Sequence, residues 1–214
     1  MMKKKIAAIV AIILALGILY LYEDADASST ESISEKWGSF LGGKSDSKGR
    51  KAKSASAGQD IYAKGKDATI SITEMKQTVY FYQLQGNENA EELAYEYMKE
   101  SAALYAKAVS EGYAVTDEEV EAYVAGLRAV LESDELDETS RQQVKDVMAG
   151  FGNEEDYWEY QVEVNRRLLV SQKYVDKLQE EFYADTSKEQ EEWNEYFDNF
   201  KRNLVEEEHF EKRE

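Results

Sequence analysis

The residue types that most often carry catalysis are scarce in this chain. His209 is the only histidine among 214 residues, and there is no cysteine. A catalytic histidine needs a positioned nucleophile in an enclosed site, whereas His209 lies in the charged terminal run EEEHFEKRE. Composition excludes thiol catalysis, disulfides, cysteine-based zinc sites and histidine-rich metal sites. We therefore predict that His209 is a surface residue and that the protein is not an enzyme and uses no metal or cofactor.

Carboxylates are abundant, and the runs 154–156 and 206–208 hold three each. Two carboxylates about 5–9.5 Å apart across a cleft can hydrolyse glycosides. Solvated helix faces explain these runs better, since acidic residues in a first helical turn interact favourably with the helix dipole. No EF-hand spacing is present. A carboxylate-dependent hydrolase is therefore the third and least favoured function.

Aromatic side chains are the richer source of binding chemistry, with 15 Tyr, 7 Phe and 3 Trp. Runs such as VYFYQ and DYWEYQ place rings on more than one face of a helix, so one ring joins the core and another contacts a partner or is incidentally exposed. Our candidate polypeptide-binding residues are Phe81, Tyr95 and Trp158, which lie off the main apolar stripes, followed by Tyr80, Tyr82, Tyr157 and Tyr160, for which a core position is the favoured interpretation.

Helices must position these rings, because the chain has no proline and its apolar residues recur at helical spacing. Gly112 suits the left-handed end of one helix, and Thr116 with Glu119 forms a capping box that begins the next. The apolar positions on the two sides of this turn are Ala94, Tyr97, Met98, Ala102, Tyr105, Ala108 and Val109, then Val120, Tyr123, Val124, Leu127, Val130 and Leu131. The spacing predicts a helical hairpin.

Other local signals complete a mainly α fold with a small β-hairpin. The hairpin joins 61–63 to 68–72 through Lys64-Gly65-Lys66-Asp67. The predicted helix starts that follow are the capping box of Ser71 and Glu74, Thr139 before a short helix, Asn153 before the longest helix at about 154–183, and Ser187 with Gln190 before the last helix.

The N-terminal residues have the pattern of an export signal. Three lysines precede the uncharged run Ile6 to Tyr22, and acidic residues follow it. Its length of about 26 Å is the short end of a membrane span, and basic-before-acidic flanks place the rest of the chain outside the cytoplasm. Two outcomes remain open: an uncleaved signal anchor inserted through residues 6–22, which we favour, and a secreted protein cleaved at Ala25-Asp26-Ala27.

Residues 28–59 are rich in Ser, Gly, Lys and Ala without sustained periodicity, which predicts a flexible linker. A short membrane-surface helix around Trp37 is the alternative, since Ile33, Trp37, Phe40 and Leu41 follow helical spacing. The linker is basic, and the chain beyond it is strongly acidic. Such a body would repel nucleic acid, so we predict no nucleic-acid partner.

The order of parts resembles the N-terminal chaperone domain of the SurA and PrsA type of secreted peptidyl-prolyl isomerases. Three stretches carry the resemblance: IYAKGKDATISITEM, AALYAKAVSEGYAVTDEEVEAYV and FGNEEDYWEYQVEVNRRLLVSQKYV. The chain departs from that family in two ways. Only residues 183–187 separate the long helix from the closing helix, so no parvulin isomerase domain fits, and there is no cysteine for lipid attachment.

The resemblance implies a membrane-tethered, extracytoplasmic module that binds unfolded or newly exported polypeptide on a concave, aromatic-lined helical surface without isomerase catalysis. The alternative is a non-catalytic scaffold that buries the same rings against one specific partner or a second copy; the sequence leaves the oligomeric state open. The predicted domains are a signal anchor or signal peptide at 1–27, a flexible basic linker at 28–59, a SurA N-terminal-like helical domain at 60–183, and a closing helix with charged tail at 184–214.

Overall fold

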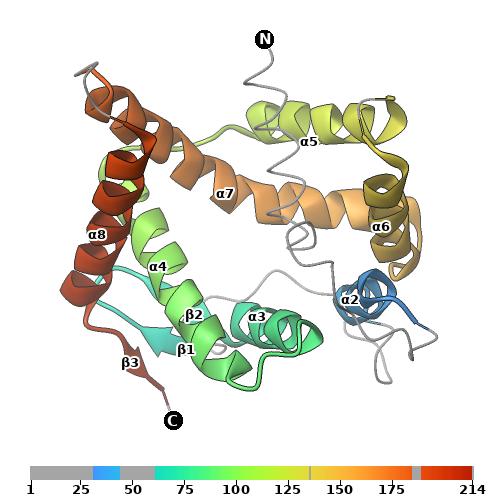
Figure 1. The fold of residues 1–214 in the computed structure, drawn as a ribbon, viewed down its shortest axis with the longest axis horizontal. Coiled ribbons are helices and arrows are strands. Elements are labelled where there is room, and N and C mark those ends of the chain that lie inside the picture. Colours follow the sequence, from blue (N-terminus) through green and yellow to red (C-terminus); the bar gives the residue numbers. More distant parts are fainter. Residues whose placement is uncertain (1–30, 44–60, 135, 185–188, 214) are drawn as a thin grey trace. The chain divides into compact units, whose positions relative to one another are not determined.

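The structure is a computed structural model that describes residues 31–43, 61–134, 136–184 and 189–213. Within these residues the chain is mainly helical, with seven helices and one small antiparallel sheet (Figure 1). The predicted mainly α fold with a small β element is therefore confirmed. The predicted membrane segment, residues 6–22, lies outside the described residues. None of the helices that are described has the length and apolar character that crossing a bilayer requires.

The chain forms two compact units, each built from two separate stretches. Of the described residues, 31–43, 116–134 and 136–165 belong to unit 1, and 61–115, 166–184 and 189–213 belong to unit 2. Helix α7 (Glu154–Phe182) contributes its first part to unit 1 and its remainder to unit 2. Each unit therefore joins segments that are far apart in the sequence.

Unit 1 contains α2 (Ile33–Leu41), α5 (Asp117–Glu132), α6 (Glu138–Ala149) and the start of α7. The predicted capping box of α5 is confirmed, since the Glu119 amide donates to the Thr116 hydroxyl at 3.2 Å. Asn153 caps α7 as predicted. The cap predicted at Thr139 is wrong, because Asp137 accepts from the Ser140 amide at 2.9 Å and α6 begins one residue earlier than Thr139. An ionised carboxylate is the better acceptor for that amide.

Helix α2 lies inside the segment that the sequence predicts as a flexible linker. Its Ser32–Glu35 capping box is complete, and the helix packs against α6. Gly38 and Gly42 make this packing possible, because a side chain at either position would overlap the backbone around Val147 and Gly150. The predicted flexible linker is therefore wrong for 33–41, where the alternative, a short helix around Trp37, is confirmed. Its predicted place on a membrane surface stays a prediction.

Unit 2 contains β1 (Ile61–Lys64), β2 (Thr69–Ser71), α3 (Ile72–Leu84), α4 (Ala90–Ser110), the end of α7, α8 (Gln190–Glu208) and β3 (Glu211–Lys212). The predicted hairpin and the Ser71–Glu74 capping box are confirmed. The predicted capping box of Ser187 and Gln190 is wrong: Ser187 lies outside the described residues, and α8 begins at Gln190 after Glu189, whose amide donates to Glu192 Oε2 at 2.8 Å. Gly112 ends the α4 region with the predicted positive φ of 86°. The two helices on either side of this turn belong to different units, α4 to unit 2 and α5 to unit 1, so they do not form the predicted helical hairpin within one unit.

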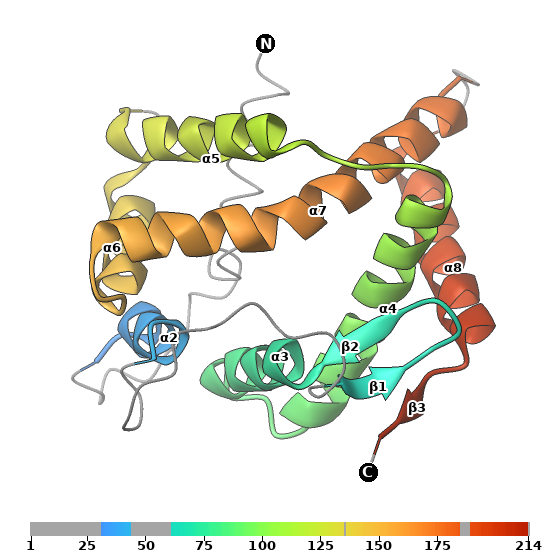
Figure 2. The ribbon, with the colours of Figure 1, turned by 180° about the vertical axis from the view of Figure 1, so that it is seen from behind.

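The sheet has the order β2-β1-β3, so the end of the chain adds a third strand beside β1 (Figure 2). The sequence treats this end only as a charged tail, and that interpretation is wrong for 211–212. The main core cluster lies beneath the sheet and includes Ala63, Ile70, Met75, Ala94, Met98 and Ala102.

Candidate binding surfaces

The three candidate residues near the start of α7 lie in unit 1 and are largely enclosed. Tyr157 and Trp158 are 2% and 5% exposed, and Tyr160 is half-buried. Phe151 holds this cluster together, with ring centroids 5.4 Å from Tyr157 and 5.5 Å from Tyr160. Burial raises the pKa of both tyrosines. Tyr157 and Trp158 therefore serve as core residues here and present no surface to a polypeptide.

Trp158 is further tied by polar contacts. Its indole Nε1 donates to Glu154 Oε1 at 3.0 Å, and the Arg128 guanidinium lies 5.5 Å from the ring centroid. Arg128 also pairs with Glu154 at 2.9 Å. A hydrogen bond from the indole, followed by the charge of Arg128, lowers the pKa of Glu154.

The other four candidates lie in unit 2 and are half-buried. Tyr82 packs against the main core cluster and touches Phe81 edge to face, with ring centroids 5.9 Å apart. Tyr95 meets Tyr62 at 5.7 Å, and the ammonium groups of Lys99 and Lys212 lie 5.0 Å and 4.6 Å from its ring centroid. Tyr80 shares helix α3 with Phe81 and Tyr82. The seven candidates thus divide between two units, three in unit 1 and four in unit 2.

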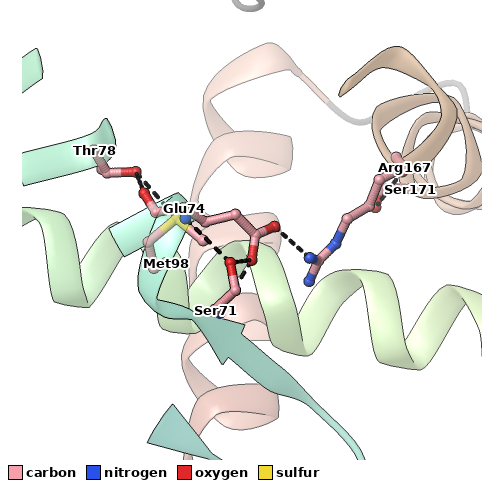
Figure 3. Close-up of polar contacts among 6 residues, drawn as sticks. All are labelled: Ser71, Glu74, Thr78, Met98, Arg167 and Ser171. Atoms are coloured by element: carbon pink, nitrogen blue, oxygen red, sulfur yellow. Dashed lines mark hydrogen bonds and ion pairs between the residues drawn. The ribbon is translucent and has the colours of Figure 1, made fainter. Parts of the chain in front are cut away.

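A polar cluster fixes α3 against α7 within unit 2. Glu74 of the capping box pairs with Arg167 at 2.5 Å (Figure 3). The Arg167 guanidinium also lies 4.6 Å from the ring centroid of Tyr105. The Thr78 hydroxyl donates to the Glu74 carbonyl at 2.9 Å and approaches Met98 Sδ at 3.2 Å. These half-buried contacts position helices, and we assign them no chemistry of their own.

The sequence interpretation missed a continuous set of eight rings in unit 2, which we name the aromatic array. Ring contacts run from Tyr113 to Tyr174 at 5.3 Å, from Tyr174 to Phe200 at 6.2 Å, and onward along α8 to the end of α7. The stacked pairs on α8 are Trp193 with Phe197 at 5.2 Å, Tyr196 with Phe200 at 6.3 Å and Phe197 with Phe200 at 6.5 Å. The members of the array are Tyr113, Tyr174, Phe182, Tyr183, Trp193, Tyr196, Phe197 and Phe200.

The array is only partly enclosed. Trp193 and Tyr174 are buried, Tyr196 is 41% exposed, and the remaining five rings are intermediate. A signal for it exists in the sequence, because positions 193, 196, 197 and 200 follow i, i+3, i+4 and i+7 spacing with aromatic residues alone. Spacing alone does not reveal what covers such a face.

One charged side chain contacts the array. Lys201 lies 5.5 Å from the Phe197 ring centroid and pairs with Glu100 at 2.9 Å and Asp198 at 3.2 Å. Burial of Lys201 opposes its charge, but hydrogen bonds to Glu100 and Asp198 outweigh burial and raise its pKa. The exposed acidic residues Glu191, Glu195 and Asp198 lie on the face of α8 opposite the ring stripe, as 3.6 residues per turn requires. The arrangement is a partly exposed aromatic surface, suited to binding apolar groups.

Metal binding has no support in the part of the chain that the structure describes, where no group of three or more His, Asp or Glu residues converges. Comparison with known proteins identifies no relative: no protein-family model, curated protein or solved structure matches the chain.

Proposed function

We propose that this protein is a membrane-tethered, extracytoplasmic chaperone-like module that binds unfolded or newly exported polypeptide without isomerase catalysis. The observation that carries the proposal is the aromatic array, where six of eight rings remain partly or well exposed on adjoining helices. Aromatic rings offer large apolar area at little conformational cost, which suits the capture of varied segments.

The rings themselves add selectivity. The faces of exposed aromatic rings stabilise Lys and Arg side chains of a client. Lys201 shows this geometry within the chain itself, since it lies over Phe197 while contacting Asp198. We expect clients in which basic and apolar residues alternate to bind best.

The order of elements also supports the proposal. A β-hairpin leads into α3, the α4 and α5 helices meet at a capped turn, and α7 is followed by α8, which packs against α4. This is the order of parts in the SurA and PrsA type of chaperone domain that the sequence resembles. The export signal at the N-terminus supports the proposed location.

An aggregation assay tests the proposal. The full-length chain in lipid nanodiscs is mixed with an unfolding client at equimolar ratio, and light scattering is followed against empty nanodiscs. We expect clear suppression of scattering. Suppression no greater than with empty nanodiscs contradicts the proposed function.

A pair of variants tests the role of the array. Tyr196→Ser with Phe197→Ser removes two partly exposed rings and should weaken client binding roughly tenfold, given about 0.5–1.5 kcal/mol per aromatic contact. Tyr123→Ser, a half-buried tyrosine of unit 1 outside the array, is the matched control. Equal loss in both variants excludes the array as the binding surface. Tight binding to one partner without general suppression would favour the scaffold function instead.

A further inference from the structure

Strand β3 covers one edge of β1 with very little structure of its own. It comprises only Glu211 and Lys212, and both residues are exposed, as is Arg213. It pairs with β1 alone, and the Arg213 amide donates to the Tyr62 carbonyl at 2.9 Å (Figure 2). Without β3, this edge of β1 would present unpaired backbone groups, to which extended peptides can add as a further strand.

The side chain of Lys212 occupies a group of three residues that we name the cation site: Tyr62 of β1 with Glu91 and Tyr95 of α4. Its ammonium lies 4.6 Å from the Tyr95 ring centroid and 5.5 Å from that of Tyr62. Glu91 Oε1 accepts from the Tyr62 hydroxyl at 3.2 Å and lies 4.0 Å from the ammonium. Aromatic faces attract ammonium groups, so two rings and a carboxylate together form a site for a lysine side chain.

Two anchors hold β3 in place, and they lie two residues apart. Phe210 packs, partly buried, against the main core cluster, and Lys212 binds the cation site. The turn that leads from α8 to these anchors passes through His209, whose φ of 51° is unfavourable for a residue with a Cβ. Release of β3 would relieve that backbone strain, so the covering strand is held mainly by one ring and one ammonium.

We propose that the edge of β1 and the cation site together form a strand-addition site for extended client segments that carry an aromatic residue two positions before a lysine. Strand β3 occupies this site when no client is bound. The choice of a client as ligand rests on the proposed function, whereas the existence of the site does not. A formal net charge of −18 favours basic segments as ligands. Because β3 is joined to α8, its effective concentration is high, and a client must compete with it.

The test measures binding of a fluorescent peptide of residues 207–213, EEHFEKR, to the full-length chain in nanodiscs by anisotropy. Phe210→Ser with Lys212→Gln removes both anchors of β3. This double variant should bind the peptide about tenfold or more tightly than wild type does, as expected for loss of an intramolecular competitor. Glu211→Gln leaves both anchors in place and is the matched control, which should bind like wild type. Equal affinity of wild type and the double variant overturns the proposal.

A disulfide tests whether the peptide binds at the edge of β1. Lys64 and Glu211 are exposed cross-strand partners, and the chain has no cysteine of its own. Lys64→Cys with Glu211→Cys, added to the double variant, should hold β3 on β1 after oxidation. The oxidised chain should lose peptide binding, and reduction should restore it. Equal affinity of the two forms overturns the proposal.

The cation site is tested by the chemistry of the peptide. A peptide with Lys212→Gln should bind the double variant about two- to fivefold more weakly than the original peptide, which corresponds to about 0.5–1 kcal/mol for an exposed contact of a cation with a ring. Tyr95→Leu in the double variant should abolish that difference. A purely structural role of Tyr95 would weaken both peptides alike, and equal binding of the two peptides to the double variant overturns the cation site.

Hydrogen exchange shows whether β3 can leave without unfolding unit 2. In the double variant, protection of 61–64 should fall and the peptide should restore it, while α4 stays protected. Loss of protection across α4 would make β3 an integral part of the core and overturns the proposal. Self-association of the wild-type chain that peptide 207–213 dissociates would make a second copy the occupant and overturns the client role.

A client arm separates this proposal from the proposed function. An unrelated extended peptide with Phe two positions before Lys should compete with the fluorescent peptide on the double variant, and a scrambled version should not. Failure of competition, with peptide 207–213 still bound, restricts the site to β3 and overturns its client role. Failure of the aggregation assay alone would refute the chaperone function and leave the strand-addition site standing.

Discussion

Glu154 serves three roles at the first residue of α7. It supplies negative charge to the first turn, accepts the Trp158 indole hydrogen bond, and pairs with Arg128 on α5. Trp158 in turn is buried, although its place off the apolar stripe suggested a binding role. The Glu154 carboxylate accepts the hydrogen bond of the indole N–H, so burial of Trp158 leaves no unpaired donor.

The lowered pKa of Glu154 predicts a specific acid sensitivity. Because the folded pKa is depressed below the ordinary value of 4.5, the stabilising contribution is fully present above that pH and is lost as pH falls through the folded pKa. The Trp158 Nε1–H signal in a ¹⁵N correlation spectrum should therefore shift with a midpoint below 4.5.

Glu154→Gln should abolish that titration, and Glu155→Gln, an exposed neighbour, should leave it in place. A midpoint at or above the ordinary carboxyl value would show that the indole and Arg128 contacts do not favour the ionised form in solution.

At the scale of elements, the last turn of α8 closes unit 2 onto its own β-hairpin. Glu208 Oε2 accepts from the amides of Asp67 and Ala68 at 2.8 Å and 2.9 Å, and its backbone carbonyl accepts from the Lys66 amide at 2.8 Å. His209 follows with a positive φ of 51°, which turns the chain into β3. The lone histidine thus serves as a helix-ending residue.

Replacing Glu208 should open this junction. Glu208→Ala leaves two hairpin amides without their acceptor and should lower the free energy of unfolding by about 1–3 kcal/mol, because a charged acceptor is lost from a buried site. Amide exchange at Asp67 and Ala68 should accelerate, and β3 should lose protection with them.

Glu207→Ala is the control, since that side chain is exposed one residue away. Unchanged exchange at Asp67 and Ala68 in the Glu208 variant would show that the turn does not depend on α8.

At the scale of the whole molecule, the main feature is the division of the chain into two units. Each unit has its own buried residues, and α7 is the helix that contributes to both. Tryptophans report on them separately, because Trp37 and Trp158 lie in unit 1 and Trp193 lies in unit 2. A destabilising substitution in the core of one unit should therefore change the signal of the tryptophans in that unit alone.

Leu127→Ala and Met98→Ala form a reciprocal pair, since both side chains are buried, at 4% and 6% exposure, in different units. Each should cost roughly 2–5 kcal/mol in its own unit through cavity formation. Urea titrations followed by indole signals should show earlier loss of Trp37 and Trp158 for Leu127→Ala, and of Trp193 for Met98→Ala. Coincident shifts of all three signals in both variants would show that the units unfold as one.

Local rules account for what could be predicted. Capping boxes at Ser71 and Thr116 and the turn at Gly112 involve residues at most a few positions apart, so residue type and spacing were sufficient to place these helix ends. The prediction that Thr139 caps α6 was wrong because two neighbouring residues could accept the hydrogen bond, and Asp137 accepts it from the Ser140 amide. The binding site was harder to predict than the helix ends, because the binding residues proposed from the sequence divide between two units.

The sequence by itself determined that the body is helical, where α3, α5 and α7 begin, and that thiol and multi-histidine chemistry are excluded, because composition and short-range hydrogen bonding govern these properties. Tertiary structure alone decided that Trp158 is enclosed, that the rings of α8 stay partly exposed, that α2 docks on α6, and that the tail adds β3. Each of these depends on burial or pairing between segments distant in the chain, and periodicity shows only that a face is apolar, not which segment covers it.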